Sequence, residues 1–424
     1  MNNYFNEAIK TIQNWVQIKS VKTESLNNKP FGENVYKMLI KALEDAKNLG
    51  FEVKNYDNYI GEVSFGDGED KDGLAILCHL DVVPEGDVKK WNYDPYCGVI
   101  KDGKIFGRGV CDDKGPAVLC LYALKELKDG GFIPNRKIKL ILGCDEESGW
   151  GCIEHYNKVA VMPDEGFSPD GDFPVIYAEK GILHIEYTYP ISNKIVNAYG
   201  GERVNMVCDC ATVECDDKIF FKSNDKDVFI KENKIIAKGI TAHGSTPQEG
   251  DNALKKLLKV LVDNNLIDVK IYNNLFNNES IFKDVYDQTG NLTFSPNVIS
   301  YENGNIKIKV DVRYPATFKK EDIENRLKTL GKYKEISYQP PLINDKNGKL
   351  VTTLLKIYND VFNDNKKPIA IGGGTYARAL VNGVAFGPCA INESIPHKPN
   401  EYLEIYRLQK CYIAYKMAIE ELCK

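Results

Sequence analysis

Three short runs of the sequence carry residue types that bind divalent metal ions. They are CHLDVVP at 78–84, GRGVCDDKG at 107–115 and LGCDEESGW at 142–150, which between them supply His79, Asp81, Asp112, Asp113, Glu146 and Glu147. A histidine with several carboxylates, and without paired cysteine thiolates at ligand spacing, is typical of zinc or a neighbouring first-row ion in an open, catalytic site. The three runs therefore predict a metal site with enough ligands for two ions.

A two-metal hydrolase also needs a base that is not a ligand. Such a site places a carboxylate between ions that lie roughly 3.5–4 Å apart, with terminal ligands on each ion and a free base that takes a proton from water. Glu146 and Glu147 follow the apolar run KIKLIL, which predicts a buried strand. Successive side chains of a strand point in opposite directions, so one glutamate can bind metal while the other faces the substrate.

Each run taken alone has an ordinary structural explanation. Asp112, Asp113 and Lys114 could form the acidic start of a helix, which the helix dipole favours. The DEES run could be a solvated turn, and His79, at the end of the apolar run LAILCHL, could be a core histidine. The conjunction of all three runs favours the metal site.

The elements that must position these residues alternate between helix and strand in the first part of the chain. Hydrophobic periodicity predicts helices over 4–18, 34–49 and 115–129 and strands over 74–79 and 137–143, and GVIKDGKIFG predicts a hairpin that turns at Asp102-Gly103. This alternation predicts an α/β fold with a mostly parallel sheet flanked by helices. Ligands bind at the carboxyl ends of strands in such sheets, which is where His79 and Glu146 lie.

The pattern changes from about residue 183, and 424 residues exceed what one core normally organises. ILHIEYTYP, DVFIKENKIIAKG and NIKIKVDVRYP predict strands, and NALKKLLKVLVDNN predicts a helix between them, which together indicate an α+β insertion. Helical patterning returns in LVTTLLKIYNDVF and in a last helix over 400–422.

Four further runs complete a family pattern. They are GFSPDGDFP at 166–174, AHGSTPQEGDNA at 242–253, GGGTYAR at 372–378 and PHKPNE at 396–401. With the first three runs, they resemble the co-catalytic zinc metallopeptidases that include carboxypeptidase G, aminoacylase and carnosinase. Within that family the sequence is most similar to the bacterial dipeptidase V branch, which is Xaa-His dipeptidase-like. The resemblance extends from near residue 33 to the C-terminus with all motifs in order.

The resemblance implies a ligand set for two zinc ions per chain, with manganese or cobalt as the alternatives. Asp112 is expected to bridge the ions. His79 and Asp170 are expected on one ion, and Glu147 and His397 on the other. Because His79 and His397 must then meet at one site, the resemblance implies that residues 1–183 and 341–424 form a catalytic domain and that residues 184–340 form an inserted lid. Cysteine at positions 78, 111 and 144, where small or hydroxyl residues are more familiar, departs from the family pattern.

The resemblance also implies the groups that act around the metals. Glu146 is the expected general base, which takes a proton from a metal-bridging water and later protonates the leaving amine. Asp81 is expected to hydrogen bond the second ring nitrogen of His79 and so fix its tautomer. The Asp112–Asp113 peptide bond is expected to be cis, as in similar enzymes.

The predicted lid carries the remaining candidates. In similar enzymes the histidine that matches His243 stabilises the oxyanion of the scissile carbonyl. Asn205 and Arg313 match positions that hold substrate, and an arginine fork suits a terminal carboxylate. For Arg313 the alternative is a salt bridge inside the sheet. The glycine loop at 372–374, with Gly373 and Gly374, allows close approach of substrate but could equally be a helix entry.

Composition limits the partners that the chain could have. A net charge of −5 gives no basic surface for nucleic acid and no polybasic membrane patch, and no apolar run of about 18 residues occurs. We therefore expect a small peptide substrate, no nucleic acid or membrane partner, and either a monomer or a homodimer.

The twelve cysteines are scattered and no signal peptide precedes them, which favours free thiols in a cytoplasmic protein. Cys208, Cys210 and Cys215 form a close group that lacks a second half, so small buried side chains are favoured over a metal cluster. His155 and His184 fit no motif and are interpreted as surface or core residues.

The sequence therefore predicts a two-zinc metallopeptidase that hydrolyses dipeptides. Two alternatives stay open at this point. One is a metal-dependent deacylase of N-acyl amino acids, of the aminoacylase or succinyl-diaminopimelate desuccinylase type. The other is an inactive relative that binds metal only.

Overall fold

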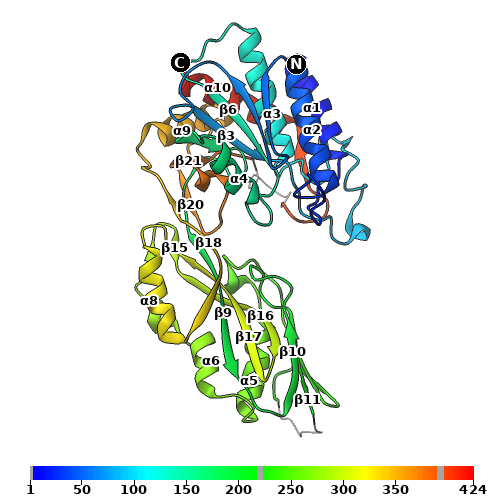
Figure 1. Cartoon of the computed structure of the whole chain (residues 1–424), viewed down its shortest axis with the longest axis vertical. Coiled ribbons are helices and arrows are strands. Elements are labelled where there is room, and N and C mark those ends of the chain that lie inside the picture. Colours follow the sequence, from blue (N-terminus) through cyan, green and yellow to red (C-terminus); the bar gives the residue numbers. More distant parts are fainter. Residues whose placement is uncertain (1–2, 217–222, 389–395) are drawn as a thin grey trace. The chain divides into compact units, whose positions relative to one another are not determined.

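Figure 1 shows the computed structural model of the chain, which describes residues 3–216, 223–388 and 396–424. The chain divides into two compact units. The first unit comprises Met1–Tyr177, Asn344–Ile369 and Thr375–Lys424, and the second comprises Ala178–Ile343 and Ala370–Gly374. The second unit contains the expected insertion, 184–340, together with residues 178–183, 341–343 and a short return of the chain at 370–374.

The first unit is built on a mixed sheet whose centre is parallel. In the described residues the strand order is β1-β2-β6-β3-β7-β21-β8-β19, with β20 paired to β8. These strands are β1 Glu52–Tyr56, β2 Ile60–Phe65, β3 Leu74–His79, β6 Ile138–Gly143, β7 Glu165–Ser168, β8 Ile176–Glu179, β19 Leu342–Ile343, β20 Ile369–Ile371 and β21 Asn382–Ala385. Strands β6, β3, β7 and β21 run parallel, and the pairs toward the edges are antiparallel. The prediction of a mostly parallel sheet is confirmed.

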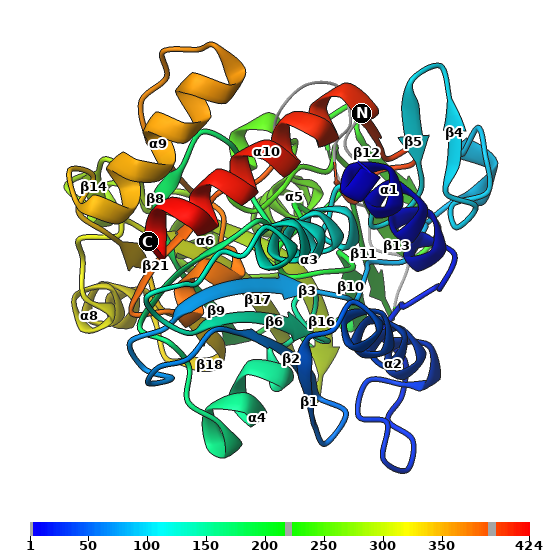
Figure 2. The same ribbon diagram turned by 90° about the horizontal axis from the view of Figure 1, so that it is seen from above.

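Helices cover both faces of this sheet. They are α1 Asn3–Val16, α2 Glu33–Asn48, α3 Lys114–Asp129, α4 Gly151–Val159, α9 Lys349–Phe362 and α10 Ile405–Leu422. Figure 2 shows α3, α1 and α10 on one side of β3 and α4 on the other. In α1 the apolar stripe from Phe5 to Val16 is buried, whereas Tyr4 is only partly buried and donates its hydroxyl to Asp129. Helix α3 is buried along its first three turns because helices α1 and α10 pack against it.

The C-terminal helix begins later than the sequence analysis expects. Residues Tyr402–Glu404 form strand β22, which pairs with β5 (Lys104–Phe106), and α10 starts at Ile405. The hairpin of β4 (Val99–Lys101) and β5 turns at Asp102 and Gly103, both with positive φ, as predicted. The expected start at residue 400 is wrong because these residues extend a small sheet before the helix begins.

The second unit is α+β, with an antiparallel sheet. Its order in the described residues is β12-β13-β11-β10-β16-β17-β9-β18. The strands are β9 Gly181–Pro190, β10 Ile195–Gly200, β11 Cys210–Cys215, β12 Val228–Lys231, β13 Lys234–Lys238, β16 Thr293–Glu302, β17 Asn305–Tyr314 and β18 Tyr333–Gln339. A small hairpin is formed by β14 (Tyr286–Asp287) and β15 (Gly290–Asn291). The helices are α5 Ala253–Asp263, α6 Val269–Phe276, α7 Glu279–Phe282 and α8 Lys320–Leu330.

Alternation along the strands builds the core of the second unit. On β9, Leu183, Ile185, Tyr187 and Tyr189 are buried, and on β17 every second residue from Ile306 to Tyr314 is buried with them. Side chains of α5 join the same core. The intervening residues of β17, among them Asp311 and Arg313, therefore lie on the opposite face of the sheet.

Among the helices of the described residues, none is long and apolar enough to cross a membrane.

A cavity at the centre of the parallel sheet should destabilise the first unit. Leu140 on β6 is fully buried, and Leu140→Ala is expected to lower the free energy of unfolding by about 2–5 kcal/mol. Ile133 is 87% exposed, so Ile133→Ala is expected to change it by less than about 0.5 kcal/mol. Urea unfolding of both variants measures the difference, and equal midpoints would contradict this account of the core.

Candidate metal centre

The candidate metal ligands lie at the carboxyl ends of three neighbouring parallel strands. His79 is the last residue of β3, Glu146 and Glu147 follow β6, and Asp170 follows β7. Parallel strands present their carboxyl ends at one edge of the sheet, so side chains from distant parts of the sequence converge there. Ser168 holds the Asp170 segment in place, because its hydroxyl donates to Leu77 O (2.7 Å) and accepts from Asp170 N (3.3 Å).

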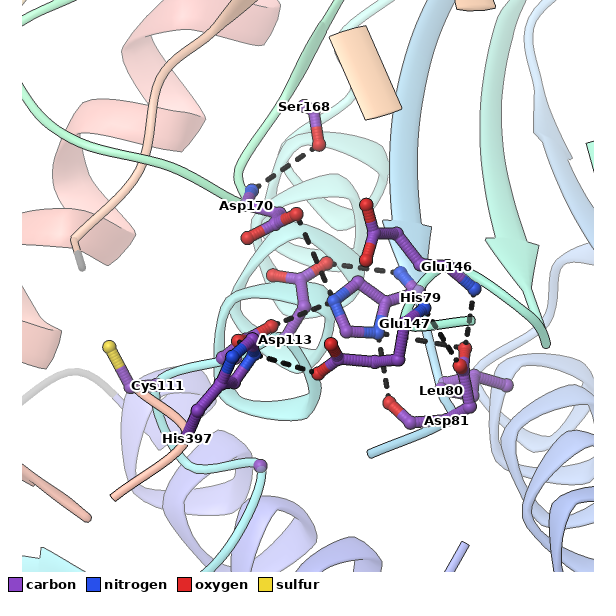
Figure 3. A network of polar contacts seen from close by, with 12 residues as sticks. His79, Leu80, Asp81, Cys111, Asp113, Glu146, Glu147, Ser168, Asp170 and His397 are labelled. Carbon is purple, nitrogen blue, oxygen red and sulfur yellow. Dashed lines mark hydrogen bonds and ion pairs between the residues drawn. The ribbon is translucent and has the colours of Figure 1, made fainter. Parts of the chain in front are cut away.

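Asp112 lies between the two histidines. Its Oδ1 is 2.8 Å from His79 Nε2, and its Oδ2 is 2.9 Å from His397 Nε2. His397 Nε2 also lies 3.1 Å from Glu147 Oε1, and Asp170 Oδ2 lies 3.9 Å from His79 Nε2. Figure 3 shows His79, Glu147, Asp170 and His397 pointing into one cluster. The expected cis peptide bond between Asp112 and Asp113 is present.

The donor set fits divalent cations. Two groups of residues bring one ligand atom each to within 4.8 Å of one another: His79 with Glu146 and Asp170, and His79 with Asp112 and Glu147. Imidazole nitrogen and carboxylate oxygen are the ligands that zinc and its first-row neighbours take in open sites. Glu146, which the resemblance assigns as a base, therefore also lies within reach of the ligand cluster.

The electrostatics of the cluster favour added positive charge. Burial, and then the charge of Asp112, raises the pKa of Asp170 to about 8. Burial and the charge of Asp170 raise the pKa of Glu146 well above its usual value. Burial alone would lower the pKa of His397, but the charge of Glu147 and the bond to Asp112 raise it. Carboxylates crowded out of water hold protons that a divalent cation could replace.

Asp81 hydrogen bonds the second ring nitrogen of His79 through its main-chain oxygen. His79 Nδ1 lies 2.9 Å from the main-chain oxygen of Asp81, whereas the carboxylate Oδ1 is 3.7 Å away. The Asp81 carboxylate accepts from the amides of Glu146 (3.1 Å) and Glu147 (3.2 Å) instead. The expected bond between Asp81 and the second ring nitrogen of His79 is therefore present, made by the main-chain oxygen rather than the carboxylate. The carbonyl still fixes the ring, and the carboxylate positions both glutamates.

Glu401 is a buried residue of this centre that the sequence analysis missed. Its Oε1 accepts from Gly109 N (3.0 Å) and Cys111 N (2.9 Å), and its Oε2 accepts from Arg108 Nη1 (2.6 Å). Glu401 thereby ties the segment after His397 to the loop that carries Asp112. A charged residue inside the PHKPNE run, paired with an arginine inside GRGVCDD, is the sequence signal that could have indicated it.

Two further residues, Asp113 and Tyr376, contact His79. Asp113 Oδ2 accepts from His79 N (3.1 Å). The ring of Tyr376, from the 3-10 helix Tyr376–Ala379, lies edge-on to the imidazole with centroids 6.0 Å apart, and its hydroxyl is 2.7 Å from Cys152 Sγ. The GGGTYAR run thus contributes a packing residue to the metal centre that no local pattern predicts.

The cysteines beside the candidate ligands are packed residues. Cys78, Cys111 and Cys144 are fully buried, and burial raises the pKa of the Cys78 and Cys144 thiols. In the second unit Cys208 and Cys215 belong to the core, as expected.

Cys210 is exposed, so the expectation of a buried side chain is wrong there. This residue starts the strand β11, with its side chain on the face away from the core.

The remaining candidates lie together in the second unit. His243 is exposed, and its Nδ1 is 2.6 Å from Ser245 Oγ. Asn205 O accepts from Gly244 N (2.8 Å), which places Asn205 beside the His243 segment. Arg313 forms the salt bridge inside the sheet, with Asp311, and its Nη1 donates to Gly372 O (3.0 Å), next to Gly373 and Gly374.

The two histidines without a motif, His155 and His184, belong to neither candidate ligand group. His155 bonds Asp57 (2.8 Å) and stacks on Tyr59, so the interpretation as a surface residue holds. His184 on β9 is 2.9 Å from Ser337 Oγ.

The sequence matches a known protein family and relatives of nearly the same length. The model of Peptidase family M20/M25/M40 matches residues 75–421. "Putative dipeptidase YtjP" of Bacillus subtilis is 34% identical over 455 residues, which cover 99% of this chain and 97% of that protein. A "Putative dipeptidase" of Staphylococcus epidermidis is 34% identical over 466 residues, with coverage of 99% and 98%.

Solved structures with the same fold cover nearly the whole chain. Human carnosine dipeptidase 1 has a TM-score of 0.60 at 15% identity and covers 99% of this chain and 97% of that one. The metallo-carboxypeptidase Sso-CP2 of Sulfolobus solfataricus has a TM-score of 0.62 at 16% identity, with 99% of both chains covered. These likenesses show the fold, while the family match and the full-length relatives at 34% identity show membership: this chain belongs to Peptidase family M20/M25/M40.

Proposed function

We propose that this chain is a dipeptidase that works with two divalent metal ions. The observation that carries the proposal is Asp112, whose two carboxylate oxygens each face a different histidine, beside Glu147 and Asp170. One carboxylate between two ligand sets is the arrangement that a two-metal hydrolase requires. Relatives described as dipeptidases, which match over nearly the whole chain, support the substrate class.

The proposed ligands divide into two sets that share Asp112. His79 and Asp170 hold one ion, and Glu147 and His397 hold the other, with zinc as the expected metal and manganese or cobalt as alternatives. When bound, the two metal ions lower the pKa of a water molecule and place positive charge beside the scissile carbonyl.

Glu146 is the proposed general base. It accepts a proton at a carboxylate oxygen from the attacking water and gives it to the nitrogen of the leaving amine. Its position follows from β6, which ends just before it, and from Asp81, which accepts from its main-chain amide. Glu146 lies in the ligand cluster but is not needed as a ligand. A binding protein without activity would have no use for such a carboxylate.

His243 is the proposed oxyanion donor. The amide of Ser245 donates to His243 Nδ1 (3.3 Å), so Nδ1 is an acceptor and a neutral ring carries its proton on Nε2. That tautomer presents Nε2–H to the carbonyl oxygen as negative charge develops there. We also propose that residues 184–340 act as a lid that brings His243 to the substrate, with hinges near 183 and 340.

Arg313, Asn205 and the glycine loop are the proposed binders of the peptide's terminal carboxylate. A guanidinium offers five N–H donors in a planar fork, so it can hold Asp311 and Gly372 O and still present donors to a substrate. The free thiols of the described cysteines favour the cytoplasm as the compartment, and either a monomer or a homodimer fits the proposal.

The substrate class is tested with purified protein supplemented with zinc or manganese. We expect hydrolysis of Leu-Leu and β-Ala-His, and much slower hydrolysis of an N-acetyl amino acid, as measured by release of free amino acid. Turnover of the acylated compound alone would establish the deacylase alternative. Absence of all turnover with both ions bound would indicate an inactive relative.

The base is tested with Glu146→Gln. Removal of the proton acceptor is expected to lower kcat by about 10²–10⁴-fold and leave two metal ions per chain. The matched control is Glu147→Gln, which should lose metal instead. Elemental analysis beside kinetics separates the two, and metal loss in Glu146→Gln would mean that base and ligand are exchanged.

The oxyanion donor is tested with His243→Ala. We expect kcat to fall by about 10²–10³-fold with the metal content unchanged. His155→Ala, which removes a partly buried histidine bonded to Asp57, is the control and should keep the wild-type rate. An unaltered kcat in His243→Ala would remove this residue from the mechanism.

A further inference from the structure

Asp311 is a fully buried carboxylate to which no role has been given so far. It lies on β17 of the second unit, on the sheet face away from the hydrophobic core, and is 0% exposed. Burial alone would raise the pKa of Asp311, but the charge of Arg313 and the contact with His184 hold it below its usual value. Asp311 is therefore a buried anion, and such a group needs partners that compensate for its lost hydration.

Arg313 is the first partner. Its Nε lies 3.2 Å from both carboxylate oxygens of Asp311, and its Nη2 lies 3.2 Å from Oδ2. The far side of the same guanidinium reaches Gly372 O through Nη1 (3.0 Å). With one edge held by Asp311, the plane of the guanidinium is fixed relative to the glycine loop.

The His243 segment packs directly against Asp311. A Cβ added at Gly244 would lie 2.1 Å from Asp311 Oδ2, so only glycine lets this segment rest on the carboxylate. Gly244 N donates to Asn205 O (2.8 Å), and Met206 pairs with His243 in an isolated bridge. The segments that carry Asn205 and His243 therefore lie directly against Asp311.

Two neighbouring strands, β9 and β18, place polar side chains in register with Asp311. In register, Asp311 stands opposite His184 on β9, and His184 stands opposite Ser337 on β18. His184 Nε2 lies 3.9 Å from Asp311 Oδ1, and His184 Nδ1 is 2.9 Å from Ser337 Oγ. His184, which lies outside every sequence motif, therefore links Asp311 to Ser337 across three strands.

We propose that Asp311 is a positioning residue that fixes Arg313 and the His243 segment in one arrangement, so that the second unit presents a preformed site for a peptide's terminal carboxylate. The inference rests on the proposed function for the roles of Arg313 and His243. Asp311 does not touch the substrate. It acts through Arg313, and the discrimination between a carboxylate and an uncharged end is the property that it controls.

The kinetic test compares Leu-Leu with its C-terminal amide in wild type and in Asp311→Asn. Loss of the charged partner should let Arg313 turn toward other acceptors. We expect KM for Leu-Leu to rise about 10-fold to 100-fold, with a much smaller change for the amide and with unchanged metal content. A general loss of folding would lower both activities alike. An unchanged ratio of kcat/KM between the two substrates would overturn the proposal.

Two variants control this comparison. Asp287→Asn removes another carboxylate of the second unit, one that accepts from Thr289 and Thr317 and has no bond to Arg313, and should keep the wild-type ratio. Gly244→Ala keeps the Asp311 carboxylate but pushes it away, and should lower the ratio as Asp311→Asn does. If Asp311→Asn does not fold, Gly244→Ala decides the question. The same loss in Asp287→Asn would overturn the proposal.

Hydrogen exchange separates this inference from the proposed function. Amides at 242–246 and 370–374 should exchange faster in Asp311→Asn than in wild type or Asp287→Asn. Exchange does not depend on turnover. If the wild type cleaves no peptide, the proposed function fails while faster exchange still supports the positioning role. Unchanged exchange in these segments would overturn the role of Asp311, whatever the activity.

Discussion

The crowding of negative charge at the carboxyl end of three parallel strands is the constraint on which the first unit depends. Its members are His79, Asp81, Asp112, Asp113, Glu146, Glu147, Asp170 and His397. Carboxylates removed from water are unfavourable unless cations or hydrogen bonds compensate them, and two histidines cannot balance six acids. The raised pKa of Asp170 and Glu146 expresses this imbalance. The positive charge of divalent cations would offset this excess of acids, so the cluster is suited to bind them.

Main-chain amides share the task of holding these acids in place. Asp81 accepts from the amides of Glu146 and Glu147, and Asp113 accepts from that of His79. Glu401 accepts from two amides of the loop that precedes Asp112. Each bond joins a carboxylate to the backbone of a ligand-bearing segment, so the geometry of the centre is fixed by groups that do not themselves need to bind metal.

The sequence could predict site residues that lie at strand ends. It could predict little about contacts that depend on which atom of a residue makes them. His79 and Glu146 were found because apolar runs end at them. Asp170 and His397 have no such local signal and came from the family resemblance alone. The Asp81–His79 bond was predictable as a pair, but spacing along a strand does not tell whether the carbonyl or the carboxylate of Asp81 faces the ring. Glu401 was missed because its partners are about 290 positions away.

Each unit contains a buried carboxylate that pairs with an arginine and lies against a neighbouring chain segment. Glu401 pairs with Arg108 and accepts main-chain amides in the first unit, and Asp311 pairs with Arg313 against a glycine in the second. Buried ion pairs contribute little net stability, because the cost of dehydrating both charges offsets their attraction. A carboxylate has two oxygens, so it can accept hydrogen bonds from an arginine and still lie against or bond a neighbouring chain segment. These pairs are therefore better explained by the geometry that they impose than by the stability that they add.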